Sequence, residues 1–195
     1  KNKSIALTDG LSDATEPVFD KGGKYLFFFA STDAGPVINW FDQSNQDMRS
    51  TNSIYLVTLQ KETNSPFAKE SDEEKVKEPT DTLKTKKDAV ATSEKKSASL
   101  VIDWDGIQNR IIDLPIQAGN YNQLGMGKEG ELLYVANNDN GPGVMHKYDL
   151  NKRKDNEVMP MNGYMLSADG KKMLYANSGK WFTSGAGEKG EPGKG

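Results

Sequence analysis

The chain has 195 residues, a formal net charge of −3 at pH 7 and a hydrophobic content of 35%. It contains no cysteine, which excludes disulfides, thiolate metal sites and a cysteine nucleophile and leaves the redox compartment open. With an isoelectric point near 5.3 it offers no basic field for nucleic acid, and no run of about 18 apolar residues is present that could cross a membrane. Composition does not distinguish a periplasmic or other cell-envelope location from a cytoplasmic one.

The chain begins with a short expected strand at residues 4–7, SIAL, followed by the turn Thr8-Asp9-Gly10. Nothing before this strand can pair with it, so it resembles the outer strand of a sheet whose other strands lie upstream. We therefore expect the chain to be part of a longer protein.

A hairpin is predicted at residues 17–30, PVFDKGGKYLFFFA. Gly22 and Gly23 supply the positive φ that a tight hairpin turn requires. The run from Tyr25 to Ala30 shows no alternation, and five consecutive large apolar residues suit a strand that is covered on both faces. Periodicity alone also suits a buried helix, but the aromatic content and the glycine turn favour the strand.

Residues 33–52 are predicted to form a loop, and its aromatic residues Trp40 and Phe41 distinguish it from a disordered segment. A loop that folds onto the face of a sheet is a common place for binding, so these two residues are the candidate contacts. The alternative, which we favour, is that they only fill the packing of a long connection.

Residues 53–59, SIYLVTL, predict a third strand, after which the composition changes. Residues 60–97 contain nine lysines and nine acidic residues, and Phe67 with a few small aliphatic residues is the only apolar content. Such a charge-balanced tract cannot offset the entropy of ordering, so we expect disorder through most of it. A short helix at residues 71–78 is the alternative.

Strand chemistry resumes at residues 97–115, with Leu100-Val101-Ile102 and Arg110-Ile111-Ile112 joined through Asp103-Trp104-Asp105-Gly106. The alternating acids before a glycine suggest a calcium loop, but a third acid is missing and Ile112 stands where the bidentate glutamate of such a loop belongs. We therefore predict a hairpin turn with a packed Trp104.

Residues 125–130, GMGKEG, match the pattern of a dinucleotide-binding loop, but the expected strand at residues 132–135 follows where that site needs a helix. No cofactor is therefore predicted. Residues 144–150 and 157–159 are expected to complete the next sheet, with the single histidine, His146, as a packed or half-exposed strand residue rather than a catalytic base.

The hairpin sequence recurs twice. Gly170 and Gly130 mark copies of the turn at Gly23, with Leu166 and Met126 in the place of Phe19. The later two glycines are 40 residues apart, the period of a four-stranded propeller blade, and removing the segments 33–52 and 60–97 brings the earlier spacing into the same range. The prediction is an all-β fold made of antiparallel four-stranded blades of a partial β-propeller, about two to three blades with a long polar insertion.

The expected organisation follows from these elements. Residues 1–10 carry the outer strand of a preceding blade, 11–116 a blade with its loop and insertion, 117–160 a second blade, 161–184 the start of a third, and 185–195 a Gly/Pro/Lys/Glu linker to a following domain. Valine is expected to destabilise the fold more at the turn residues Gly23 and Gly170 than at Gly187 in this tail.

Four segments together resemble the second β-propeller of the tricorn-like serine peptidases. They are, in order, SDATEPVFDKGGKYLFFFAS, SIYLVTLQKETNSPFAKESDEE, VIDWDGIQNRIIDLPI and NGYMLSADGKKMLYA. The hairpin pattern is shared with TolB-like and dipeptidyl-peptidase-like propellers, and the pieces SPFAKESDEE and DWDGIQNRIIDLP narrow the resemblance.

The resemblance implies a large hydrolase in which propellers precede a PDZ domain and a peptidase core, and in which a propeller guides peptide entry or product exit. The catalytic residues of that family lie downstream, so no residue of this chain inherits a catalytic, cofactor or metal role, and His146, Ser167 and Asp169 are not expected to form a triad. The implied partners are a peptide or protein substrate and the remaining blades and peptidase domains of the same protein. Whether that protein is a homo-oligomer stays open. The alternative is a TolB-like propeller module that binds a protein or cell-envelope partner.

Overall fold

The computed structural model of the protein describes residues 4–37, 47–68, 100–138 and 140–190. Within these ranges the chain forms three antiparallel sheets and one short 3-10 helix, η1 (Ile107–Arg110). The first sheet has the order β1 (Ala14–Phe19), β2 (Tyr25–Val37), β3 (Asp47–Thr58), β4 (Ile111–Asp113). The second has the order β5 (Tyr121–Met126), β6 (Glu131–Asn138), β7 (Gly141–Asp149), β8 (Lys154–Pro160), and the third contains β9 (Gly163–Leu166), β10 (Lys172–Asn177) and β11 (Lys180–Gly185).

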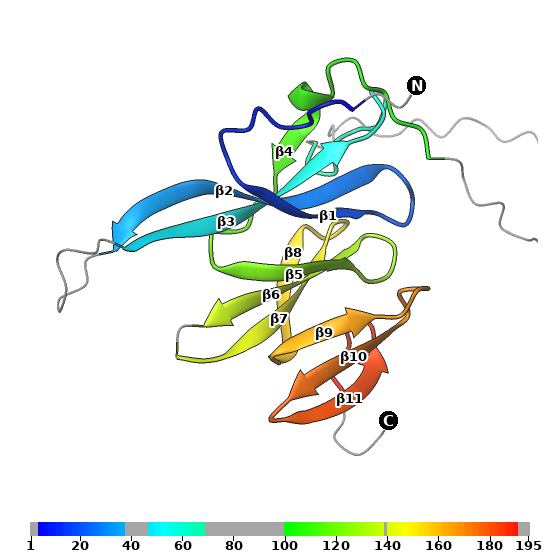
Figure 1. Ribbon diagram of the computed structural model, residues 1–195. Helices are drawn as coiled ribbons and strands as arrows, with labels where there is room; N and C mark the ends of the chain where they lie inside the picture. Colours follow the sequence, from blue (N-terminus) through cyan, green and yellow to red (C-terminus); the bar gives the residue numbers. More distant parts are fainter. Residues whose placement is uncertain (1–3, 38–46, 69–99, 139, 191–195) are drawn as a thin grey trace, which may run out of the picture.

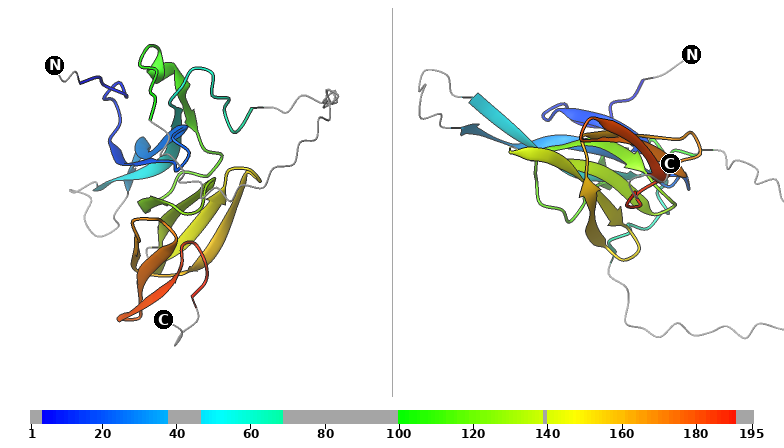
Figure 2. Two further views of the ribbon diagram at one scale, coloured as in Figure 1. Left: turned by 90° about the vertical axis from the view of Figure 1, so that its right-hand side faces the viewer. Right: turned by 90° about the horizontal axis from the view of Figure 1, so that it is seen from below.

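The sheets follow one another in space as they do in sequence, from the first at the top of Figure 1 to the third at the bottom. The side view in Figure 2 shows the same succession. The prediction of an all-β fold with antiparallel four-stranded sheets is confirmed, and the arrangement is that of partial propeller blades. No helix in the described part of the chain is long and apolar enough to span a membrane.

Each sheet begins with the predicted glycine hairpin. Gly23, Gly130 and Gly170 have φ values of 66°, 81° and 61°, so the three turns use the left-handed conformation that glycine adopts without strain. Phe19 pairs with Leu26 and Leu166 pairs with Met173 across equal turns. In the second copy Met126 pairs with Leu132, so that turn is one residue shorter and the strand register moves by one relative to the glycine.

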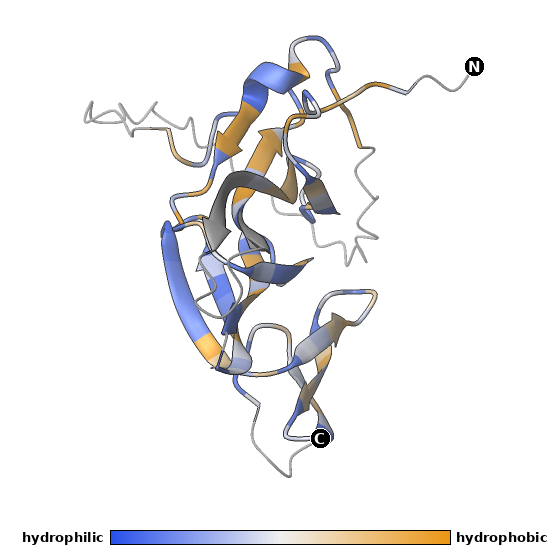
Figure 3. Cartoon of the chain, turned by 60° about the vertical axis from the view of Figure 1, so that its left-hand side comes forward, coloured by the Kyte–Doolittle hydropathy of each residue, from blue (hydrophilic) through white to orange (hydrophobic). Residues whose placement is uncertain are grey.

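The first seam, which we define as the interface between the first and second sheets, contains a large apolar cluster. Phe27 and Phe29 of β2 pack in one cluster with Leu132 and Tyr134 of β6. The opposite face of β2 is also buried, because Phe28 packs among residues outside the seam. The prediction that this strand is covered on both faces is therefore confirmed, and Figure 3 shows hydrophobic stretches on the strands of the first sheet.

The second seam, between the second and third sheets, uses the other face of β6. Leu133 and Val135 pack with Met173 and Tyr175 of β10. Because neighbouring residues in a strand point to opposite faces, the consecutive apolar run of β6 supplies both seams. The second sheet is thus enclosed on both sides.

Two predicted strands are absent from the structure. Residues 4–13 form no strand, and Leu7 instead packs against the outer face of the first sheet. Residues 100–102 also form no strand. The backbone of Asp103 donates a hydrogen bond to the carbonyl of Leu59, and η1 follows in place of the predicted hairpin, so β4 stands alone as the fourth strand. Trp104, predicted to be packed, is 51% exposed.

The prediction that residues 33–52 form a loop is wrong at both ends of this segment, because both ends are strands. Strands β2 and β3 continue past a bulge and pair from Asp33 with Thr51 to Val37 with Asp47, so the hairpin is much longer than the apolar pattern indicated. Backbone pairing needs no apolar side chains, which is why the polar sequence concealed it. Trp40 and Phe41 lie outside the described residues.

The predicted polar tract begins later than expected, because residues 66–68 pack on the second sheet. Phe67 meets Tyr148 edge-on at a centroid distance of 6.4 Å, and the Arg153 guanidinium donates to the carbonyls of Pro66 and Ala68 at 3.0 and 2.7 Å. The expected disorder and the alternative helix at 71–78 fall on residues 69–99, outside the described part.

The start of the predicted linker is also packed. Ala186 is buried in the second seam and donates a backbone hydrogen bond to the carbonyl of Lys171. Gly187 has a φ of 66°, and a Cβ there would lie 2.8 Å from Leu133 Cδ2, whereas a Cβ at Gly23 meets only Leu100 at 3.6 Å. A Cβ at Gly170 would meet the Lys21 side chain. The structure therefore gives no reason to expect valine to be better tolerated at Gly187 than at the two turn glycines, and the ranking stays a prediction.

Candidate functional site

The inner row is the set of first strands of the three sheets, β1, β5 and β9. Each pairs with its own sheet on one side only, and β1 lies beside β5 while β5 lies beside β9. Residues 14–17 of β1 are exposed, so the row presents a surface rather than a core at this end. In a ring of such sheets this surface faces the axis.

The inner row carries two irregularities at matching places. The register of β1 shifts between Thr15 and Val18, and that of β5 shifts between Asn122 and Gly125. Within these bulges Glu16 and Gln123 have φ values of 51° and 54°, a region that side chains other than glycine seldom adopt.

Both bulge residues reach the next sheet. Glu16 Oε2 accepts a hydrogen bond of 2.7 Å from the backbone N–H of Leu124, and Gln123 Oε1 accepts one of 3.0 Å from the backbone N–H of Tyr164. The Tyr164 hydroxyl donates to the carbonyl of Gln123 at 2.6 Å. Burial, together with the negative charge of Glu16, raises the pKa of the Tyr164 phenol above its ordinary value.

The turns of all three sheets gather at one end of the inner row. The Lys21 ammonium, in the turn of the first sheet, donates to the carbonyls of Asp169 and Gly170 in the turn of the third, both at 3.2 Å. A hollow of about 320 Å³ opens between the turns of the first two sheets. Its lining includes Asp20, Lys24 and Glu129, so charges of both signs border it.

His146 lies on β7 and faces the first seam. Its Nδ1 is 2.6 Å from Asp155 Oδ2, and its ring stacks on Tyr134 at a centroid distance of 5.1 Å. Burial first, and then the Asp155 carboxylate, raise the pKa of the Tyr134 phenol. His146 is therefore a packed strand residue, as the sequence predicted, and it is paired with an acid of its own sheet.

Ser167 and Asp169 lie elsewhere, in the turn between β9 and β10. Ser167 Oγ donates to Asp169 Oδ1 at 2.6 Å and accepts from the backbone N–H of Lys172 at 3.0 Å. These contacts close the turn. They use the hydroxyl and the carboxylate within the third sheet, apart from the pair formed by His146.

The two sequence motifs that resembled ligand sites have local structural roles. Lys61 donates from its backbone N–H to Asp103 Oδ2 and from its ammonium to Asp105 Oδ2, and this ammonium holds the pKa of Asp105 below its ordinary value. The glycines at 125–130 lie where β5 turns into β6, two antiparallel strands. Among the described residues no group of three or more His, Cys, Asp or Glu side chains is arranged to hold a metal ion.

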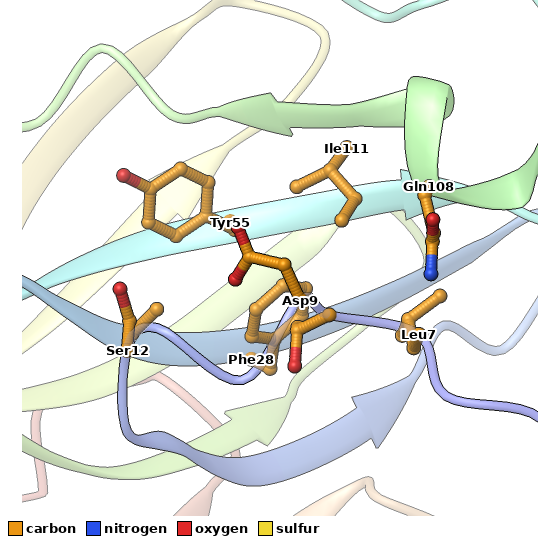
Figure 4. A pocket seen from close by; sticks show the side chains of 9 residues that line it. Leu7, Asp9, Ser12, Phe28, Tyr55, Gln108 and Ile111 are labelled. Carbon is orange, nitrogen blue, oxygen red and sulfur yellow. The ribbon is translucent and has the colours of Figure 1, made fainter.

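A second hollow, of about 330 Å³, lies on the outer face of the first sheet. Figure 4 shows the N-terminal segment on one side of it and the first sheet on the other. Phe28 and Tyr55, whose rings stack at a centroid distance of 5.8 Å, line it together with Asp9, and the Gln108 amide donates a hydrogen bond to the carbonyl of Ala6. The hollow suits an apolar side chain.

The outer face of the third sheet carries apolar side chains that are exposed to solvent. The register places Met165 opposite Leu174 and Trp181 opposite Ala176, so these four side chains share one face. Met165, Leu174 and Trp181 are 67%, 39% and 65% exposed. Exposed apolar side chains that share one face make it a candidate interaction surface.

Comparison with known proteins gives one informative similarity. No family model and no solved structure matches the chain. A curated protein of Streptomyces coelicolor named "Putative tricorn protease homolog 2" is 22% identical over 205 residues, which cover 96% of this chain. This chain is similar to part of a tricorn protease homologue. The chain spans only 17% of that protein, so the comparison supports a loose relationship to the tricorn proteases and leaves the activity of the whole open.

Proposed function

We propose that the chain is a non-catalytic propeller segment of a tricorn-like serine peptidase, and that it guides peptide substrate or product along its inner row to a peptidase core in the same protein. The observation that carries the proposal is the repetition of one interface through the stack of sheets. The similarity to a tricorn protease homologue supports the choice of peptidase.

The repetition is visible at three equivalent positions. Phe27, Leu133 and Leu174 occupy one position of the repeat. Each directly follows the residue that pairs with the last residue of its inner strand, which is Phe19, Met126 or Leu166. Phe27 and Leu133 are fully buried against the next sheet, whereas Leu174 is 39% exposed. The outer face of the third sheet thus has the chemistry of a seam without the neighbour, which supports a further blade of the same protein as its occupant.

The opposite end of the stack supports the same proposal. Phe28 of the first sheet occupies the position of Tyr134 and Tyr175, which receive the preceding sheet in the two seams. The 330 Å³ hollow lies on this face. Phe28 itself is buried beside Ile107 and Leu7, so at this end the hollow is the part of the face that stays open to a further blade.

The guiding role is tested in the longer protein by adding bulk to the inner row, along which the proposal places the passage of the peptide. Thr15 is exposed on β1, so Thr15→Trp adds bulk there without disturbing the core. We expect slower cleavage of long peptides and unchanged cleavage of a short reporter peptide that enters freely. Lys152→Trp is the matched control, because Lys152 is exposed in a turn at the far end of the second sheet. Equal cleavage of long peptides by both variants contradicts the guiding role.

A further inference from the structure

The inner row contains a repeated contact that the sequence analysis did not predict. Glu16 and Gln123 stand three residues before Phe19 and Met126, the matching residues that open the two hairpins, so they occupy the same position in the repeat. Both have a left-handed backbone, and both accept a hydrogen bond from a backbone N–H of the following sheet. The two acceptors differ in chemistry, a carboxylate and an amide, yet they make the same contact.

We propose that Glu16 and Gln123 are latches: positioning residues that fix each inner strand to the next and so set the order and spacing of the sheets. The donors also match, because Leu124 and Tyr164 occupy one repeat position, immediately after that of the latch. Among the described residues, strands β5 and β9 each pair with one neighbouring strand, so an N–H on their other side has no ladder partner there. The latch satisfies that donor across the seam, where leaving it unpaired is unfavourable.

The bulge explains how the side chain reaches the neighbouring sheet. In a regular strand, side chains point to the two faces, whereas a bulge adds an unpaired residue and redirects its side chain. A left-handed conformation is unfavourable for glutamate and glutamine, so it persists where the surroundings compensate for it. The hydrogen bond to Leu124 or Tyr164 provides that compensation.

The series of latches ends inside this chain. Gly163 occupies the latch position of the third sheet and has no side chain to extend, and a Cβ there would lie 2.9 Å from Gln123 Nε2. Gly163 therefore leaves space for the Gln123 side chain, and it has no side chain that could make the same contact with a following sheet. At the other end, Pro17 occupies the receiving position of the first sheet and has no N–H to donate. The latches join these three sheets to one another and offer nothing to a sheet on either side.

Amide hydrogen exchange in the 195-residue chain, followed residue by residue by NMR, tests the latches. Glu16→Gly removes the acceptor while relieving the left-handed backbone, so the fold is retained. We expect the Leu124 amide to exchange about fivefold faster, the factor that corresponds to one hydrogen bond of ordinary net strength, with the Tyr164 amide unchanged. Gln123→Gly should give the reverse pattern, with only the Tyr164 amide accelerated.

Two further variants separate a latch from a general structural role. Glu16→Gln keeps an acceptor oxygen and should leave the Leu124 amide protected, and Thr15→Ala, beside the latch, should change neither amide. Acceleration of both amides together in either glycine variant would show general loosening and overturn the proposal. Unchanged exchange at Leu124 and Tyr164 would overturn it as well, because the side chains would then serve only the bulges.

Discussion

The second sheet and the third sheet carry the same apolar pattern on the face that points onward along the stack, yet only one of these faces is closed. Leu133 of the second sheet is fully buried beneath β10, whereas Leu174 at the equivalent place in the third sheet is 39% exposed. The pattern therefore belongs to the repeat, and burial depends on whether a neighbouring sheet is present. On the proposal that a further blade covers this face, the alternating burial pattern of β10 reflects a missing neighbour rather than a face that is exposed to solvent in the longer protein.

The largest expected effect is on the free energy of unfolding, and one substitution on each of the two faces tests the comparison. Leu133→Ala leaves a cavity in the second seam and should lower the free energy of unfolding by about 2–5 kcal/mol. Leu174→Ala removes surface that is already partly in water and should cost about 1 kcal/mol or less. Urea unfolding of the 195-residue chain measures both, and equal losses would show that the two faces are equally covered.

A glycine pair gives the next largest effect. Gly187 and Gly179 both have positive φ, at 66° and 74°, but a Cβ at Gly187 would meet Leu133 whereas a Cβ at Gly179 has nothing within 4 Å. Valine at either position should cost about 1–3 kcal/mol for the backbone, and Gly187→Val should add about 1–3 kcal/mol for overpacking the second seam. Thermal unfolding of the two variants is the measurement. Identical shifts in Tm would place Gly187 outside the seam.

The smallest effect on the free energy of unfolding is expected for substitutions on the outer face of the third sheet. Met165→Ser and Trp181→Ser should change the free energy of unfolding by about 0.5 kcal/mol or less, because both side chains are mostly exposed. Their effect should appear in association instead, since exposed apolar surface favours contact between molecules. Sedimentation velocity at increasing concentration should show less self-association than in the unsubstituted chain. Unchanged association would mean that another surface drives it.

The sequence was sufficient wherever apolar pattern and turn chemistry agreed. The glycine hairpins and the doubly covered strand β2 combine both signals, and they were predicted correctly. Prediction failed where backbone or single long-range contacts decide the structure. The pairing from Asp33 to Val37 leaves no hydrophobic signature, and residues 100–102 are apolar but pair with no strand in the described part of the chain.

The latches illustrate a second kind of limit. Glu16 and Gln123 are ordinary polar residues in an exposed stretch, and only the backbone conformation shows that their side chains cross to the next sheet. The repeat alignment held a usable signal, because an acid and an amide fall on one position. The candidates that the sequence did offer, Trp40 and Phe41, lie outside the described residues and stay predictions.

The central claim is that the outer face of the third sheet is a seam surface covered by a further part of the longer protein. Hydroxyl-radical footprinting read by mass spectrometry tests it directly, because methionine and tryptophan oxidise readily when exposed. In the 195-residue chain, Met165 and Trp181 should oxidise rapidly, while the buried Met145 should stay protected as an internal control. In the longer protein all three should be protected. Rapid oxidation of Met165 and Trp181 in the longer protein would contradict the account.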